Sequence, residues 1–276
     1  MFAWITKIKS LRGTSFLEVM IALLILSVVT TAIFKLYITQ HKNYLIQDDV
    51  TNIQQNVRAS ITELSRHIRM AGYNLPMGLP ALAAANTNPD TITITYQSAG
   101  CDTYLSESMS QPSAELKCAT DVSCFKNGQW VYIYDPDSAV GEWFEITEVQ
   151  AGTKCLQHNT MALSRAYGKD AIVLVMTQVK FFIDETTDPN HPDLMLQLPG
   201  QPPIPYAENI CDLQFRYRMK NGLVLDAPTL VNDVREVMIF AIGRSNNPDI
   251  ELTKEVEGQY RHRSFSTSVY LRNIDT

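Results

Sequence analysis

The residues with the clearest potential for chemistry lie close together near the amino terminus. Gly13 ends a short basic leader and carries no side chain, so the backbone on either side of it is accessible to a peptidase at the membrane surface. Glu18 stands just before an uncharged run, residues 19–34. An isolated acid inside a membrane-spanning helix costs about 2.5–3.5 kcal/mol on insertion scales and usually marks a partner or a function. Glu18 is therefore a candidate docking residue, and Gly13 marks the junction between the basic and the apolar segments.

Two simpler interpretations of this stretch are less favoured. A secretory signal peptide has its cleavage site after the apolar core, whereas here the glycine precedes it. A plain membrane anchor is compatible with residues 14–34, which approach the roughly 20 residues needed to cross a bilayer. Glu18 argues against an anchor with no further role.

The charges flanking the apolar run predict its orientation. Three cations precede it, Lys7, Lys9 and Arg12, while cations and acids are mixed after it. Positive flanks stay in the cytosol, so the carboxy-terminal bulk is expected outside. Loss of the leader's three cations takes the net charge from −6 to −9. Such a chain carries no electrostatic footprint for nucleic acid.

The five cysteines all fall in the part expected to be exported, where disulfides persist. We expect two disulfides among four of them, namely Cys101, Cys118, Cys124 and Cys155, with the pairing left open. A zinc site is the competing interpretation, but Cys118 and Cys124 are too far apart for the usual Cys-x2–4-Cys pair. Cys211 shares one face of an alternating segment with Leu213 and is expected to be a buried free thiol.

No enzyme motif of the kinds that carry nucleophilic, nucleotide or zinc chemistry is present in the sequence. The five histidines are scattered, with no pair at ligand spacing. Residues 184–193 are rich in oxygen ligands but lack the spacing and the glycine of an EF-hand, so an acidic solvated turn is favoured over calcium binding. We expect no enzymatic activity, no cofactor and no metal.

The element that positions Glu18 is a long helix. No proline or glycine occurs from Thr14 to Ala71, so nothing interrupts a helix over residues 14–70. After the apolar part, apolar residues recur at steps of three and four and form one stripe: Val50, Ile53, Val57, Ile61, Leu64, Ile68 and Ala71. Three heptads without systematic flanking charges favour packing on the chain's own sheet over a coiled coil. Gly72 and Pro76 predict the helix end.

Beyond the helix, short runs of β-branched and aromatic residues predict strands at 91–97, 129–135, 142–149, 171–183, 210–219, 234–242 and 265–272. Runs that alternate without intervening helical patterns favour an antiparallel sheet. Residues 76–89, 98–126, 184–192 and 198–205 are expected to be loops. The predicted fold class is α+β, a long amino-terminal helix whose second half packs on an antiparallel β-sheet.

Several segments resemble one known family. Residues 12–18, with the sequence RGTSFLE, resemble the class III signal of type IV prepilins and pseudopilins. Residues 66–73 (RHIRMAGY), 234–239 (VREVMI) and 265–273 (FSTSVYLRN) resemble PilW-type minor pilins, which are related to the J-type pseudopilins of type II secretion. The resemblance brackets most of the chain, while its middle, residues 98–126 especially, matches nothing in that family. Thr14 stands where the family usually has phenylalanine.

The resemblance implies a processing step and a pilin-like fold. A prepilin peptidase would cut between Gly13 and Thr14 and methylate the Thr14 amine. Glu18, at the fifth mature position, would dock on the cationic amine of a neighbouring subunit. The implied parts are a leader (1–13), a transmembrane or filament-core half of the helix (14–37), an amphipathic half (38–72) and a β-rich head (73–276).

The implied function is that of a non-enzymatic minor pilin that helps to prime a type IV pilus. Its expected partners are the prepilin peptidase, other minor pilins, the major pilin, the inner-membrane assembly platform and the membrane, with no nucleic acid. It would be a single-pass inner-membrane protein with a cytoplasmic amino terminus and a periplasmic head, and later part of the pilus tip. Two alternatives stay open: a J-type minor pseudopilin, and a membrane-tethered binding domain with no assembly role.

Overall fold

The computed structural model describes residues 15–76, 78–97, 100–249 and 260–274. It divides into two compact units, Met1–Asp49 and Val50–Thr276, and each is described by itself. The expected processing residues, Gly13 and Thr14, lie outside the described residues.

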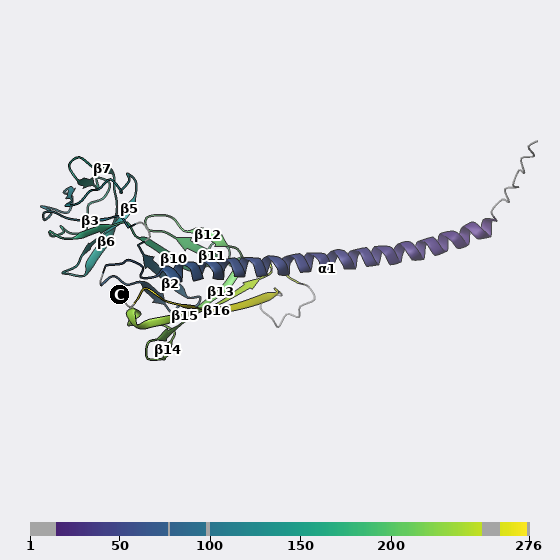
Figure 1. The fold of residues 1–276 in the computed structure, drawn as a ribbon. Coiled ribbons are helices and arrows are strands. Elements are labelled where there is room, and N and C mark those ends of the chain that lie inside the picture. The colour runs from purple at the N-terminus through teal and green to yellow at the C-terminus, as the bar shows by residue number, and fades with distance from the viewer. Residues whose placement is uncertain (1–14, 77, 98–99, 250–259, 275–276) are drawn as a thin grey trace, which may run out of the picture. The chain divides into compact units, whose positions relative to one another are not determined.

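A single helix, α1 (Phe16–Met70), accounts for the amino-terminal part of the described chain (Figure 1). The carbonyl of Ser15 accepts the N–H groups of Glu18 and Val19 at 2.9 and 3.2 Å and opens the first turn. The helix ends at Met70, as the sequence predicts. Gly72 follows with a φ of 78°, a left-handed conformation that stops a helix.

Two antiparallel sheets form the part of the second unit that carries its main core. One has the order β1-β2-β10-β11-β12, with β1 (Leu82–Ala85), β2 (Thr91–Tyr96), β10 (Thr177–Asp184), β11 (Asp193–Gln197) and β12 (Ile204–Ala207). The other has the order β14-β13-β15-β16, with β13 (Ile210–Met219), β14 (Val224–Leu225), β15 (Val234–Arg244) and β16 (His262–Tyr270). A short 3₁₀ turn, η1 (Val231–Asp233), precedes β15.

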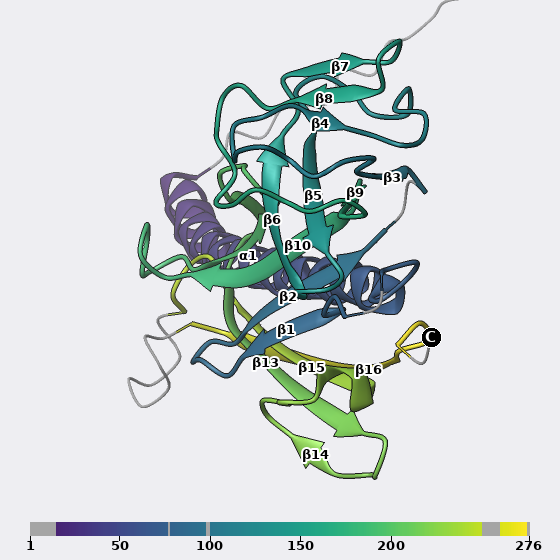
Figure 2. The ribbon, with the colours of Figure 1, turned by 90° about the vertical axis from the view of Figure 1, so that its left-hand side faces the viewer.

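The segment between β2 and β10 forms two further antiparallel sheets (Figure 2). One has the order β3-β9-β5-β6, with β3 (Asp102–Tyr104), β5 (Trp130–Asp135), β6 (Val140–Glu145) and β9 (Ile172–Leu174). The other has the order β4-β8-β7, with β4 (Leu116–Lys117), β7 (Glu148–Gln150) and β8 (Cys155–Gln157). We refer to residues 100–176 as the inserted module.

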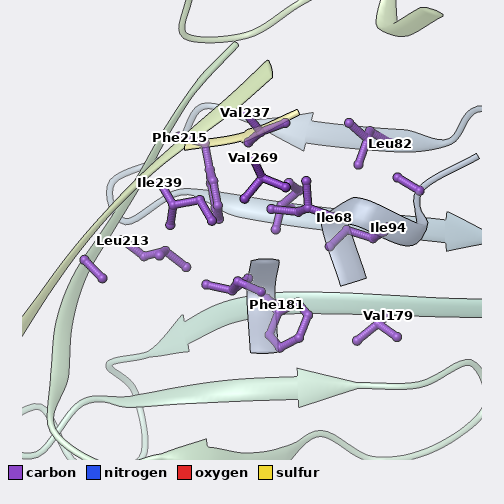
Figure 3. Packing of buried hydrophobic residues seen from close by; sticks show 14 of the residues in the cluster. Ile68, Leu82, Ile94, Val179, Phe181, Leu213, Phe215, Val237, Ile239 and Val269 are labelled. Carbon is purple, nitrogen blue, oxygen red and sulfur yellow. The ribbon is translucent and has the colours of Figure 1, made fainter. Parts of the chain in front are cut away.

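The main core lies between residues 50–70 of α1 and the first two sheets. Five of the seven residues in the predicted apolar stripe are buried: Ile53, Val57, Leu64, Ile68 and Ala71. Figure 3 shows Ile68 among side chains from both sheets, including Phe181 of β10 and Ile239 of β15. The second half of the helix therefore packs on antiparallel sheets, which confirms the α+β class predicted from the sequence.

The inserted module has a hydrophobic core of its own. Val131 and Ile133 of β5, Phe144 of β6 and Val173 of β9 are among its fully buried members. A separate core explains why this segment can fold without contributing side chains to the main one.

The structure differs from the predicted elements where one apolar run serves two sheets. The run at 142–149 is split into β6 and β7, and the run at 171–183 into β9 and β10, because the strands of each pair belong to different sheets. The expected loop at 76–89 contains β1, and the expected loop at 98–126 contains β3 and β4. Strands of two to four residues are too short to show an alternating pattern.

Candidate functional site

The amino-terminal part of α1 presents apolar side chains to the outside on every side. The exposed residues include Phe16, Ile21, Leu24, Val28 and Phe34. An 18-residue window of this helix is long and apolar enough to cross a membrane, and none of it is buried within the protein. A helix that is apolar all round is one that is surrounded by lipid or by other protein.

Polar side chains within this apolar part bond to the helix's own backbone. The hydroxyl groups of Ser27 and Thr31 donate to the carbonyls of Leu24 and Ser27, both at 2.8 Å. Thr39 donates in the same way to Lys35 at 2.9 Å. In an apolar solvent a hydroxyl group has no water to bond to, so a hydrogen bond to the helix backbone satisfies it.

Glu18 is different from these hydroxyl residues. It lies in the first turn of α1, it is exposed, and its carboxylate makes no hydrogen bond or ion pair with any described residue. The first-turn N–H groups of a helix carry partial positive charge, which favours an acid at this position. A carboxylate is an acceptor only, so the complementary partner for Glu18 is a cation or an N–H donor from outside the described chain.

At the other end of α1, residues 66–73 contribute to the packing of the second unit. His67 is buried: its Nδ1 lies 3.0 Å from the Tyr96 hydroxyl, and its Nε2 lies 3.0 Å from Glu63 Oε1. A neutral imidazole fits both contacts, accepting the tyrosine O–H and donating to the carboxylate. Burial, and then the positive charge of Arg66, lower the pKa of His67. Tyr96 lies on β2, and nothing in the sequence pairs it with this helix.

The carboxy-terminal segment meets the end of the helix at Gly72. Asn273 Nδ2 donates to the Arg69 carbonyl at 3.2 Å. A Cβ at Gly72 would lie 2.7 Å from the Asn273 carbonyl oxygen, too close for any residue but glycine. The two segments that separately resemble one family in sequence, 66–73 and 265–273, therefore contact each other. Their residues join the helix end to the chain's last strand.

The cysteines follow the sequence expectation only in part. Cys101 and Cys124 form a disulfide. Cys118 and Cys155 are buried and not bridged, so the expected second disulfide is absent from the described residues. The register pairs Lys117 with Cys155, which places Cys118 one step away and on the opposite face of the strand pair.

Cys211 is also outside the disulfide, as expected, but it is only half-buried. The register of β13 against β15 shifts between Ile210 and Asp212, so Cys211 sits in a bulge. A bulge interrupts the alternation of faces, and this is why Cys211 does not share the fully buried environment of Leu213.

The oxygen-rich segment at 184–193 forms hydrogen bonds within itself and with Asn209, the residue before β13. The Asp184 carboxylate accepts the hydroxyl groups of Thr186 and Thr187, each at 2.6 Å, and the backbone N–H of Thr186 at 2.8 Å. These hydrogen bonds hold the pKa of Asp184 well below its usual range. Asp193 accepts the N–H of Asn209 at 3.0 Å. Among the described residues no group of three or more His, Cys, Asp or Glu side chains has a metal-binding arrangement.

No family model matches the chain, and no curated protein matches it. Among solved structures, a type IV-like pilin from Thermus thermophilus is similar to it with a TM-score of 0.40 and 9% sequence identity, over 80% of this chain and 97% of that one. At this identity and TM-score the likeness does not extend to function.

Proposed function

We propose that this chain is a minor pilin that takes part in priming the assembly of a type IV pilus. The observation that carries the proposal is the exposed apolar helix with one acid, Glu18, in its first turn and no described partner for that acid. A neighbouring subunit's amino-terminal amine supplies the opposite charge, and N-methylation of that amine preserves it. Removal of this chain's own leader at Gly13 creates the corresponding amine at Thr14.

The remaining parts of the chain have distinct tasks in this proposal. The apolar part of α1 first spans the inner membrane and then lies in the filament core. The β-rich head contacts other minor pilins. Compact-domain scaling gives residues 73–276 a radius of gyration of roughly 17 Å. A head of that size is difficult to repeat at every position of a tightly wound filament, so the subunit occurs in few copies at the tip.

The partners follow from the same steps. The prepilin peptidase removes the leader, the inner-membrane platform extracts the subunit from the bilayer, and the major pilin adds below it. The head is periplasmic before assembly because the cations before the apolar run hold that end in the cytosol.

Processing tests the first step. Gly13→Val should block cleavage, because a branched side chain hinders the backbone that the peptidase must reach. Intact-mass analysis of the membrane-extracted wild-type chain should show residues 1–13 missing. A dominant uncut wild-type species, in a host with an active prepilin peptidase, would favour the membrane-tethered domain with no assembly role.

Docking is tested by three substitutions at one position. Glu18→Ala and Glu18→Gln remove the charge and make bilayer insertion easier, so the protein should still be inserted and cut. Assembly should fail, with few surface pili while the major pilin stays abundant in the membrane, as in a deletion strain. Glu18→Asp keeps the charge and is the matched control. Normal pili containing the usual amount of the Glu18→Ala protein would show that Glu18 has no docking role.

A further inference from the structure

Strand β16 is the longest terminal strand of the four described sheets. It has nine residues, whereas the other terminal strands, β1, β3, β4, β6, β7, β12 and β14, have two to six. Its register against β15 runs without a shift from Glu236↔Tyr270 to Arg244↔His262. Natural sheets usually protect such edges with proline, lysine, a bulge or a short strand. Residues 264–270 have no proline and no charged residue.

Two hydrogen bonds just beyond the ends of β16 fix which of its backbone groups face the open edge. Leu271 donates its N–H to the Arg235 carbonyl at 2.9 Å, and Ser245 donates to Arg261 at 2.8 Å. In an antiparallel pair the bonded residues alternate, so the odd-numbered residues of β16 bond to β15. The even-numbered ones direct N–H and C=O away from it: Ser264, Ser266, Ser268 and Tyr270. No described residue hydrogen-bonds to these outward groups.

The outer face of the sheet beside this edge is hollowed and partly apolar. The side chains of Ser266 and Ser268 are small, and the residues opposite them on β15 are Phe240, 39% exposed, and Met238. A depression of about 750 Å³ is lined by these four side chains together with Gln214 and Arg216, among others. Bulky side chains placed above the serines would cover Phe240 and Met238.

We propose that β16 is the site at which this protein pairs with an extended segment of another subunit of the same assembly, which adds a strand to the β14-β13-β15-β16 sheet. The unpaired N–H and C=O groups recur at every second residue, about 7 Å apart, and only another extended backbone matches that spacing. The added strand carries bulky apolar residues at alternate positions, which lie in the depression. The inference rests on the proposed function, because that function supplies the other subunits.

A second copy of this chain fits the edge less well. Two-fold pairing centred on Ser266 would set Ser266 against Ser266 and Ser264 against Ser268. Such a pairing makes the backbone hydrogen bonds and sets Phe265 against Thr267 on one face. On the face that carries the depression it brings only serines together and leaves Phe240 and Met238 uncovered, whereas stable cross-strand pairs are aromatic or β-branched. The serine-rich edge is therefore suited to a different, bulkier strand.

The test uses the full chain in the bacterium that encodes it, with the photo-cross-linking amino acid p-benzoylphenylalanine in place of Tyr270. The reference position is Ser138, an exposed residue in the turn between β5 and β6. The expected result is an adduct from position 270, absent from position 138. Its cross-linked peptide should map to an alternating apolar segment of another leader-bearing subunit.

The adduct is then compared in two backgrounds. Ser266→Pro removes one outward N–H and leaves the β15 ladder unchanged, since proline is tolerated where the missing N–H faces away from the sheet. Ser266→Ala keeps that N–H. In the proline variant the yield of adduct should fall about tenfold, because one backbone hydrogen bond is lost and the pyrrolidine ring obstructs the added strand. In the alanine variant the yield should not change. If proline impairs folding, Ser268→Lys replaces it, because lysine on an edge opposes strand addition.

Three results would overturn the proposal: no adduct from position 270, an adduct with a second copy of this chain, or an adduct insensitive to both Ser266→Pro and Ser268→Lys. These results are distinct from failure of the proposed function. If the leader is cut and the chain is needed for pili but β16 gives no adduct, the strand-pairing site alone is wrong. An uncut leader with normal pili in a deletion strain contradicts the proposed function itself.

Discussion

The two parts of helix α1 have the same backbone conformation but bury their apolar residues in different ways. In residues 16–45 the large apolar side chains point outward in all directions, and Leu24 is 65% exposed. In residues 50–70 they are confined to one stripe, and Leu64 is 0% exposed. The first part depends on lipid or other subunits for burial, whereas the second is buried by its own sheets.

This difference shows which part of the chain supports the fold and which part supports association. A residue in the stripe contributes to the stability of the head, because unfolding exposes it to water. A residue in the apolar part is exposed in the described structure, so its substitution leaves no cavity there.

Replacing leucine by alanine should lower the free energy of unfolding strongly in the second part of the helix and hardly at all in the first. Leu64→Ala leaves a cavity in the main core and should lower the free energy of unfolding by about 2–5 kcal/mol. Leu24→Ala should change it by less than about 0.5 kcal/mol, because the side chain is exposed and its truncation leaves no cavity. Chemical unfolding of the detergent-solubilised full chain measures both values. Equal losses would mean that the apolar part of the helix also stabilises the head.

The inserted module should depend on its disulfide. Replacing Cys101 and Cys124 together by alanine removes a bridge with a sequence separation of 23 and should cost about 2–4 kcal/mol. Cys211→Ala, outside the bridge, is the control and should cost much less. Thermal unfolding under non-reducing conditions measures the difference.

Peptide mapping and thiol alkylation check the disulfide assignment itself. Mapping without reductant should find Cys101 joined to Cys124, with Cys118, Cys155 and Cys211 as thiols. Burial raises the pKa of Cys118 to about 11, so this thiol should react with alkylating agents only after unfolding. A bridge between Cys118 and Cys155 would show that the register of β4 against β8 is wrong.

Gly72→Ala tests whether contact with the carboxy-terminal segment fixes the end of the helix. The new Cβ would meet the Asn273 carbonyl oxygen, and the φ of 78° is unfavourable for alanine, so a loss of about 1–2 kcal/mol is expected. Gly222→Ala is the matched control, since its φ of 85° is also left-handed but no atom lies within 4 Å of its Cβ position. A melting temperature equally high in both variants would contradict the proposed contact.

His67 should give the smallest effect, a change in pH dependence. Its pKa in the folded state is lowered by burial and by Arg66, so the neutral form is favoured on folding. The resulting stability is present above the unfolded pKa, about 6.5, and is lost as the pH falls below it. His67→Gln should flatten the stability profile between about pH 7 and 5.5, where the acid-range titration of Glu63, whose pKa is lowered, interferes little.

His41→Gln is the control for this experiment in the other part of the helix. His41 is exposed, so folding of the head should not change its environment. Unfolding midpoints measured across the pH range should therefore follow the wild type. A wild-type profile in the His67→Gln variant would show that His67 does not titrate with folding.

The sequence by itself determined the features that depend on local pattern. The absence of glycine and proline fixed the course of α1, and Gly72 with Pro76 fixed its end at Met70. The three- and four-residue spacing identified Ile53, Val57 and Leu64 as buried, because a helical period of 3.6 brings such residues to one face. The strands at 210–219 and 234–242 could be predicted because the alternation of side chains along a strand is also a local pattern.

Tertiary structure decided the features that require residues far apart in the sequence to meet. It split the run at 171–183 between two sheets, paired Cys101 with Cys124, and left Cys118 one register step from Cys155. It also brought Tyr96 to His67 and left the outward backbone groups of β16 without a partner among the described residues. None of these follows from a local pattern, because strand order, register and the position of an edge depend on which segments pair once the chain has folded.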